Sequence, residues 1–446
     1  MVVRDIHLKE HLGIVTSDTS TIRFSFFLTP LNDRISVGKN DYVVIDHPVL
    51  GEVCPVLAVV KEISNYEKAA GLSFAEKAVE LVAACEVIGY VDLRGSETRI
   101  LRALLFPPDT GSKVYLPFYD FLKDVFLRDL EGKVYPSAIH LGTRQTFANT
   151  KEGGIRMLGF FLNDWDFTRQ HFLVSGVSGV GKTHVAAVVV EELANRTAVP
   201  VVVLDSYGEY CGVAVRAKNF GKITKTAGVS REEYPFDSKF SVYSSDPERV
   251  RSKLDGLGAE MGSKGRFSVK PVSSQWVGSG KKSVGSVGGE LAKSVSGSGV
   301  TVFDAEGLSF EEKRVFFANS VLSLLESRVK GLVQPFVLVV EDAEIVGDDV
   351  LRRVAAEGKK LGVSVCLLTR NPSELDGAVL SLMGMQILGR TTGSWDLECL
   401  RNMALEHVSD LPRLAIGEFI VNGVTLREPT KVLVRERYSA KTSAHD

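Results

Sequence analysis

A glycine-rich stretch near the middle of the chain carries the residue types needed to bind phosphate. Its glycines let the backbone curl so that successive N–H groups point inward, and the N-terminus of a following helix adds partial positive charge. Lys182 would reach the β- and γ-phosphates, and the Thr183 hydroxyl would hold Mg²⁺. The stretch consists of Gly176, Val177, Ser178, Gly179, Val180, Gly181, Lys182 and Thr183. We predict an ATP site here, with His184 in the first helical turn beside it.

Two acids further along the chain would complete a hydrolytic site. Glu341 and Asp342 follow five apolar residues, 336–340, that are typical of a central strand. One acid at the end of such a strand orients the ligands of Mg²⁺, and the next positions and polarises the attacking water. We assign Glu341 to the metal and Asp342 to the water. Together the two stretches predict an ATPase.

The elements that position these residues form an α/β pattern. Apolar runs typical of buried strands alternate with helical patterns over residues 185–193, 310–330 and 351–360. The runs cover residues 171–175, 201–204, 300–303, 336–340, 363–368 and 386–389. This alternation predicts a mostly parallel sheet with both faces covered, the fold of P-loop NTPases. Ligands of such sheets bind at the carboxyl ends of the strands, where the glycine-rich stretch and the paired acids fall.

The N-terminal part has a different pattern. Short apolar or alternating runs between residues 13 and 60 are separated by turn residues and predict a small β-barrel. Residues 72–84 are expected to be helical, and 85–91 and 98–106 to be further strands. We predict a barrel with a helical insertion over residues 1–105, a connector over 106–145 and the ATPase domain over 146–435. Residues 436–446 are expected to be a disordered tail.

One segment of the predicted ATPase domain stands out in composition. Residues 261–299 consist largely of Gly, Ser, Val and Lys, with six basic residues and the single acid Glu290. We expect a flexible basic insertion. Mobile basic loops neutralise nucleic-acid phosphates, but scattered lysines also keep a loop solvated, and both interpretations stay open.

Composition and charge restrict the class of protein. The 446 residues are 44% hydrophobic and 24% charged, as in ordinary globular proteins, and the formal net charge is −2. No global positive field recruits nucleic acid, so such binding needs a local patch or a ring of subunits. The five cysteines are odd in number and widely spaced, which fits a reducing compartment. Since no run of about 18 apolar residues occurs, we expect a cytoplasmic protein without a membrane segment.

Several stretches resemble, in the same order along the chain, those of the HerA-type DNA translocases in the wider HerA–FtsK group. Residues 205–210 (DSYGEY) are similar to the D-x-x-G-E-Y signature of that family. The other stretches are residues 139–142, similar to an I-x-I-G motif; 357–362, similar to R-E-G-R-K-x-G; 369–376, similar to T/S-Q-R-P-S-x-L; and 416–423, similar to a closing G-E-x-I-V-x-G hairpin. The N-terminal barrel resembles the HAS-barrel of the family.

The resemblance implies a RecA-like ATPase core in a ring-forming translocase or helicase, which acts on double-stranded DNA and hydrolyses ATP between subunits. It implies a homo-hexamer that works with a NurA-type nuclease or another effector in the processing of DNA ends. Glu209 would then be a functional acid of the site, although a loop acid that pairs locally fits the same position. Lys359 and Lys360, and also Arg390, are candidates for the residue that reaches into the neighbouring site.

The chain departs from the family pattern at catalytic positions. The paired acids occur as Glu341-Asp342, so the catalytic acid is one methylene shorter than a glutamate. Arg370 replaces the usual sensor glutamine, and a guanidinium cannot accept a hydrogen bond from water. Both arginines of the R-E-G-R-K-like run have changed, to Ala356 and Lys359. These departures keep a second function open: a nucleotide-binding hexameric scaffold with weak ATPase that regulates a partner effector. A motor with another cargo, as in the ATPases of secretion systems, is a third.

Overall fold

The computed structural model describes most of the chain in two compact units. The described residues are 7–29, 37–65, 81–93, 101–127, 138–149, 155–215, 239–257, 267–272, 295, 299–403, 405, 407–426 and 428–442. The barrel unit comprises residues 1–136 and 143–161, and the C-terminal unit comprises residues 137–142 and 162–446.

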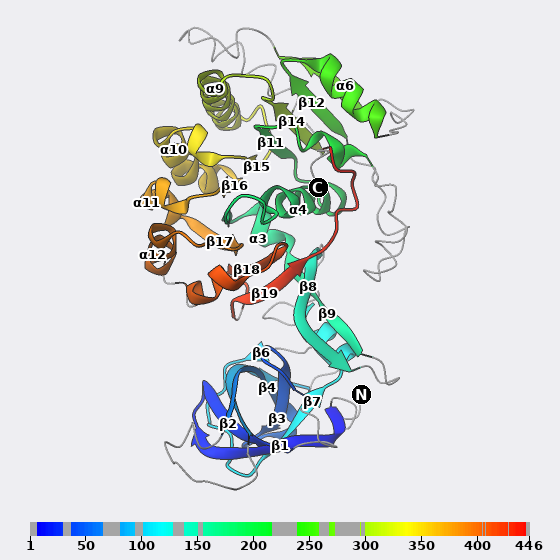
Figure 1. Ribbon diagram of the computed structural model, residues 1–446, viewed down its shortest axis with the longest axis vertical. Helices are drawn as coiled ribbons and strands as arrows, with labels where there is room; N and C mark the ends of the chain where they lie inside the picture. Colours follow the sequence, from blue (N-terminus) through cyan, green and yellow to red (C-terminus); the bar gives the residue numbers. More distant parts are fainter. Residues whose placement is uncertain are drawn as a thin grey trace. The chain divides into compact units, whose positions relative to one another are not determined.

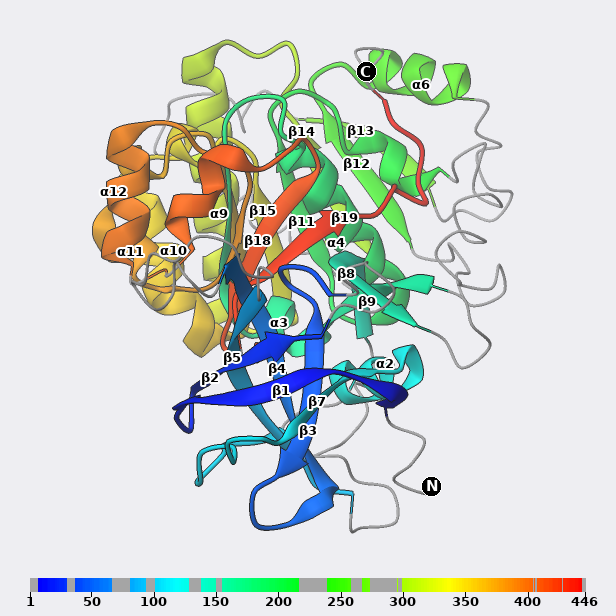
Figure 2. The same cartoon turned by 60° about the horizontal axis from the view of Figure 1, so that its bottom comes forward.

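The barrel unit contains a closed antiparallel barrel, seen in the lower part of Figure 2. Its described strands follow the order β2-β1-β7-β3-β4-β5-β6, and pairing of β2 with β5 closes the ring. Alternating side chains, including Phe24, Phe26 and Val56, fill the interior. The strands are β1 (His7–Thr19), β2 (Arg23–Leu28), β3 (Tyr42–His47), β4 (Gly51–Asn65), β5 (Leu81–Val91), β6 (Leu101–Arg102) and β7 (Lys113–Pro117); helix α2 (Tyr119–Phe126) follows.

The barrel confirms the predicted fold class, but its details differ from the expected ones. Strand β7 lies between β1 and β3, so the barrel continues past residue 105, where we expected a connector. The helix expected over residues 72–84 is wrong at its C-terminal end, because residues 81–84 belong to strand β5 and pair with β2. The rest of that expected helix lies outside the described residues.

The C-terminal unit is built on a long mixed sheet. Strands β13-β12-β14-β11-β15-β16-β10-β17 run parallel, and β18 and β19 continue the sheet as an antiparallel pair. Nearly all central-strand side chains are buried, as expected for apolar runs covered on both faces. The strands are β10 (His171–Ser175), β11 (Val201–Asp205), β12 (Phe240–Ser244), β13 (Phe267–Pro271), β14 (Val300–Asp304), β15 (Phe336–Val340), β16 (Val363–Thr369), β17 (Met383–Leu388), β18 (Glu418–Gly423) and β19 (Thr430–Val434); β8 (Ala138–Asn149) and β9 (Ile155–Asn163) complete the order.

Helices cover both faces of this sheet. Figure 1 shows α9, α10, α11 and α12 in a row on one side, whereas α4 and α6 lie on the other. The sequence sets some of their ends: Ser309 and Glu312 form a capping box at the start of α9. The helices are α3 (Asp164–Thr168), α4 (Lys182–Arg196), α6 (Pro247–Gly256), α9 (Phe310–Val329), α10 (Asp348–Gly358), α11 (Gly377–Leu380) and α12 (Ser394–Asn402), with short 3-10 turns η2 (Cys211–Ala214), η3 (Ala343–Ile345), η4 (Lys359–Leu361), η5 (Pro372–Glu374) and η6 (Val408–Arg413).

Two expectations for this unit need correction. The segment 261–299 is not wholly an insertion, because β13 lies within it and pairs with β12. Its Lys270 donates to the Tyr243 hydroxyl at 3.2 Å, and most of its other residues lie outside the described part. The tail expected from residue 436 is also wrong up to Thr442, since Tyr438 and Ser439 are buried. Among the described residues, no helix has the length and apolar character that crossing a bilayer requires.

Candidate functional site

The glycine-rich stretch forms a tight loop between β10 and α4. Gly176, Gly179 and Gly181 adopt φ values of 149°, 81° and 102°, which residues other than glycine rarely adopt. The loop is held by backbone hydrogen bonds at both ends: Val177 N donates to Arg390 O at 2.8 Å, and Gly417 N donates to Val180 O at 3.1 Å. The loop leads directly into the N-terminus of α4, whose partial positive charge favours the binding of phosphate.

Lys182 is the first residue of α4 and lies against this loop. Its Nζ donates to the carbonyl oxygens of Gly176 at 2.8 Å and Val177 at 3.2 Å. Burial lowers the pKa of the ammonium group, and the nearby Arg370 charge acts in the same direction. Three acids, Asp342, Glu344 and Glu341, act in the opposite direction, so negative charge surrounds the lysine.

Glu341 joins the loop to the end of β15. The Thr183 hydroxyl donates to Glu341 Oε1 at 3.0 Å, and the Ser206 N–H donates to Oε2 at 3.1 Å. The side chain is only 4% exposed. Burial raises the pKa of its carboxyl well above the ordinary value, and the charges of Asp205, Glu209 and Asp342 raise it further. The structure thus brings together the two residues to which we assigned the metal.

Asp342 follows in a left-handed backbone conformation, with φ 47° and ψ 65°. This conformation is uncommon for a residue with a side chain and is typical of sites where geometry matters more than local stability. Arg370 Nη2 lies 3.9 Å from Asp342 Oδ1, whereas Oδ2 is buried and has no hydrogen-bond partner among the described residues. Burial, followed by the neighbouring Asp342 carboxyl group, raises the pKa of Tyr207 to about 12. The carboxylate therefore lies between a phenol and a guanidinium.

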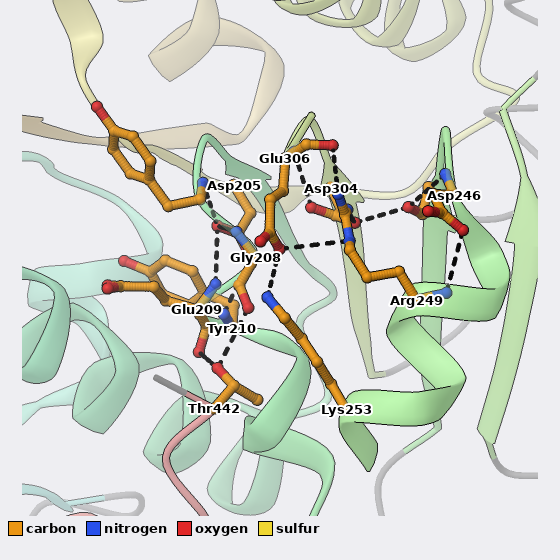
Figure 3. A network of polar contacts seen from close by, with 12 residues as sticks. Asp205, Gly208, Glu209, Tyr210, Asp246, Arg249, Lys253, Asp304, Glu306 and Thr442 are labelled. Carbon is orange, nitrogen blue, oxygen red and sulfur yellow. Dashed lines mark hydrogen bonds and ion pairs between the residues drawn. The ribbon is translucent and has the colours of Figure 1, made fainter. Parts of the chain in front are cut away.

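The D-x-x-G-E-Y stretch forms a loop organised by its first residue (Figure 3). Asp205 Oδ1 accepts hydrogen bonds from the N–H groups of Tyr207, Gly208 and Glu209, and Oδ2 accepts one from Tyr210. Burial and the neighbouring Asp304 raise the pKa of Asp205 to about 6. Asp205 is thus a structural residue that fixes the loop and presents Glu209 near Glu341.

A set of charged side chains packs on the other side of this loop. Asp304 Oδ2 accepts from Arg249 Nη2 at 2.7 Å, and Glu306 pairs with Lys253 and Arg249. Gly208 has φ 70°, a conformation that favours glycine, and a Cβ there would lie 2.1 Å from Glu306 Oε2. Figure 3 shows these groups between β14 and α6.

Other predicted residues lie elsewhere. The His184 ring is hydrogen-bonded through Nε2 to the Arg435 carbonyl oxygen at 2.8 Å. Lys359 and Lys360 follow α10 at the edge where the parallel strands begin, opposite the glycine-rich loop, and Lys359 Nζ donates to Gln170 Oε1 at 2.9 Å. Arg390 is exposed at the end of β17, beside the loop. The two lysines therefore do not join the site formed within this chain.

Sequence reasoning missed two residues of the site, Glu344 and Lys313. Glu344 lies in the turn after Asp342, its Oε2 is buried without a described hydrogen-bond partner, and burial raises its pKa. Lys313 of α9 donates to Ser206 O at 2.8 Å and lies 4.8 Å from the centre of the Tyr207 ring. The spacing of Glu344, two residues after Asp342, was the one available signal. Lys313 carries no motif.

The donor set fits Mg²⁺. The Thr183 hydroxyl oxygen and Glu341 Oε1 are 3.0 Å apart. Hard oxygen ligands of this kind, with a phosphate to share, are those that Mg²⁺ prefers. Thr183 and Glu341 are therefore the residues that would hold the ion, directly or through its water.

A parallel sheet with a glycine-rich loop after β10 and paired acids after β15 defines a P-loop ATPase. Residues 162–259 match the model of a family described as "Helicase HerA, central domain". A probable helicase of Methanocaldococcus jannaschii is 21% identical over 95% of each chain. The DNA double-strand break repair helicase HerA of Pyrococcus furiosus is 22% identical over 96% of this chain and 92% of its own. These comparisons confirm the resemblance to the HerA-type ATPases.

Among solved structures, VirB4 of Thermoanaerobacter pseudethanolicus aligns with a TM-score of 0.38 and 15% identity, over 67% of this chain and 96% of that chain. The genome packaging NTPase B204 of Sulfolobus turreted icosahedral virus 2, in complex with sulfate, aligns with a TM-score of 0.34 and 12% identity, over 59% of this chain and 96% of its own.

Proposed function

We propose that the protein hydrolyses ATP to move along double-stranded DNA during the processing of broken DNA ends. The observation that carries the proposal is the contact between Thr183 of the loop and Glu341 at the end of β15, with Asp342 next in the chain. A relative over nearly the whole chain is named a DNA double-strand break repair helicase, which supports DNA as the polymer.

The side chains divide the work of hydrolysis among them. The Lys182 ammonium would bind β- and γ-phosphate oxygens, and the loop N–H groups would orient the chain of phosphates. Asp342 Oδ2, which has no described hydrogen-bond partner, would accept a hydrogen bond from the attacking water and orient it. Arg370 would donate to a phosphate oxygen. When bound, Mg²⁺ supplies positive charge that neutralises the phosphate oxygens, and Thr183 and Glu341 would hold it.

The assembly we propose is a cytoplasmic homo-hexamer that works with a NurA-type nuclease or another effector. The resemblance to the HerA-type ATPases supports the ring. Arg390, Lys359 and Lys360 are the cations we propose for the contact with a neighbouring subunit. Lys359 and Lys360 are exposed on the edge of the sheet away from their own site, as a residue acting on another subunit must be.

The test is steady-state ATP hydrolysis by the purified protein with and without duplex DNA. Turnover that rises with DNA in the wild type and vanishes in Lys182→Ala is the expected result. Since Lys182 Nζ donates to two loop carbonyl oxygens, those of Gly176 and Val177, the variant should keep the fold, which circular dichroism checks. DNA-independent turnover would refute coupling to DNA, and equal turnover in Lys182→Ala would refute the site.

A second function is favoured by the surroundings of Asp342. The Asp342 side chain is one methylene shorter than that of a glutamate. Its Oδ1 lies 3.9 Å from Arg370 Nη2, and this ion pair can keep the carboxylate from reaching the attacking water. We propose as the alternative a nucleotide-binding scaffold with weak ATPase that regulates a partner effector. It predicts tight ATP binding, slow turnover and no effect of DNA. Binding of a fluorescent ATP analogue, measured beside hydrolysis, separates the two functions.

A further inference from the structure

The C-terminal residues 435–442, which we call the strap, cross the C-terminal unit from α4 to the loop of residues 206–210. The strap follows β19, and Figures 1 and 2 show this red segment running past α4. Arg435, Arg437, Tyr438 and Ser439 are all buried, with at most 8% of each residue exposed. A segment buried to this degree is part of the packed unit.

The first anchor of the strap is a buried charge cluster on α4. Arg435 donates from Nη1 to Glu191 Oε1 and from Nη2 to Glu192 Oε1, both at 2.7 Å. Glu191 also accepts the backbone N–H groups of Tyr438 at 3.1 Å and Ser439 at 3.0 Å. Helix α4 begins at Lys182, so this cluster fixes the strap to the helix that carries the phosphate-binding lysine.

The second anchor is the loop that carries Glu209. The Thr442 hydroxyl lies 3.2 Å from Gly208 O and 2.9 Å from Glu209 O, as Figure 3 shows. Between the anchors, Ala440 N donates to Val215 O at 2.7 Å, and a Cβ on Gly212 would lie 2.3 Å from Ala440 O. The strap therefore touches the chain on both sides of Glu209.

The strap is bonded directly to the backbone of Glu209. The charge of Glu209 raises the pKa of Glu341, so the two carboxyl groups are close enough to interact. Asp205 holds the loop through backbone N–H groups, but the carbonyl oxygens of Gly208 and Glu209 point to the strap instead. The same eight residues are thus bonded to Glu191 and Glu192 of α4 and to the backbone of Gly208 and Glu209.

We propose that the strap sets the distance between Glu209 and the phosphate-binding helix α4, with Thr442 as a positioning residue for ATP hydrolysis. This inference rests on the proposed nucleotide site. Thr442 touches no reacting atom and acts through Glu209. Its loss should therefore slow the chemical step and leave ATP binding by Lys182 and Thr183 unchanged.

Two substitutions at Thr442 test the proposal. Thr442→Val keeps the shape and removes the hydroxyl, and Thr442→Ser keeps the hydroxyl. Since one neutral hydrogen bond contributes about 0.5–1.5 kcal/mol, kcat should fall roughly two- to tenfold in Thr442→Val with KM for ATP unchanged. Thr442→Ser should restore kcat. The matched control is Thr197→Val, which removes a hydroxyl that donates to Leu193 O at 2.7 Å at the far end of α4.

Hydrogen exchange of the amides of residues 206–210 provides a readout that does not depend on hydrolysis. Exchange should be faster in Thr442→Val than in the wild type and in Thr197→Val. Unchanged exchange would overturn the strap as a positioning element, as would equal losses of kcat in Thr442→Val and Thr197→Val. If the wild type does not hydrolyse ATP, the proposed function fails, and the exchange measurement still decides whether the strap holds the loop.

Discussion

Replacing Arg435 by methionine should lower the free energy of unfolding of the C-terminal unit by about 3–5 kcal/mol, because two buried carboxylates lose their partner. The structure places the value near the lower end of this range. Glu191 keeps two backbone N–H donors, and Glu192 keeps Arg196 Nε at 2.7 Å and His140 N at 3.2 Å. Each carboxylate therefore stays partly compensated.

A triple variant separates stranded charge from lost packing. Arg435→Met combined with Glu191→Gln and Glu192→Gln leaves no unpaired buried carboxylate, and should be more stable than Arg435→Met alone by roughly 1–2 kcal/mol. Urea unfolding followed by circular dichroism measures both variants. A cost below about 1 kcal/mol for Arg435→Met, or a triple variant less stable than the single one, would refute the reasoning from buried charge.

Three further predictions concern the loop, the catalytic acid and pH. Gly208→Ala should cost about 1–3 kcal/mol more than Gly331→Ala in urea unfolding, because both have φ 70° but only at Gly208 would the Cβ meet Glu306; equal costs would contradict this. Asp342→Glu should raise kcat, by up to about 100-fold, as the longer acid reaches the water; lower turnover would show that Asp342 is correctly placed. Burial lowers the pKa of His140 from 6.5 to about 3, so between these pH values the histidine is protonated in the unfolded chain but not in the folded one. The free energy of unfolding should therefore decrease as the pH is lowered below 6.5, by up to about 1.4 kcal/mol per pH unit. Asp166 and Asp205, whose carboxyl pKa values are raised to about 6, have the opposite effect below that pH. The measurement is therefore the pH dependence of the free energy of unfolding in the wild type and in His140→Gln, and equal slopes in the two proteins would contradict the prediction.

Features that are local in sequence could be predicted. The glycines, Lys182 and Thr183 lie within one short stretch, and Glu341 and Asp342 directly follow an apolar strand. Because β10 and β15 both pair in parallel with β16, the two stretches lie at the same edge of the sheet, where the strands end. The alternation of apolar runs with helical patterns likewise predicted the parallel sheet, since burial on both faces requires it.

Features that depend on distant partners could not be predicted. Arg435 and Glu191 are 244 residues apart, and no motif around either residue predicts that they pair. Residues 436–442 are polar in sequence and were expected to be disordered, but α4 supplies buried acceptors for their charges and N–H groups. Residues 81–84 follow a helical pattern locally, and cross-strand pairing with β2 prevails over that preference.

The position of β10 in the sheet has a consequence for synthesis. β10 ends at Ser175, but its two neighbours, β16 and β17, begin at Val363 and Met383, and the arginine that pairs with α4 is residue 435. A ribosome making the chain at roughly 5–20 residues per second therefore exposes the glycine-rich loop for about 10–50 s before its supports exist. During that interval the nascent apolar strand is a target for chaperones or for incorrect pairing. Strand β10 gains both of its neighbours in the sheet only after Leu388, the last residue of β17, has been synthesised.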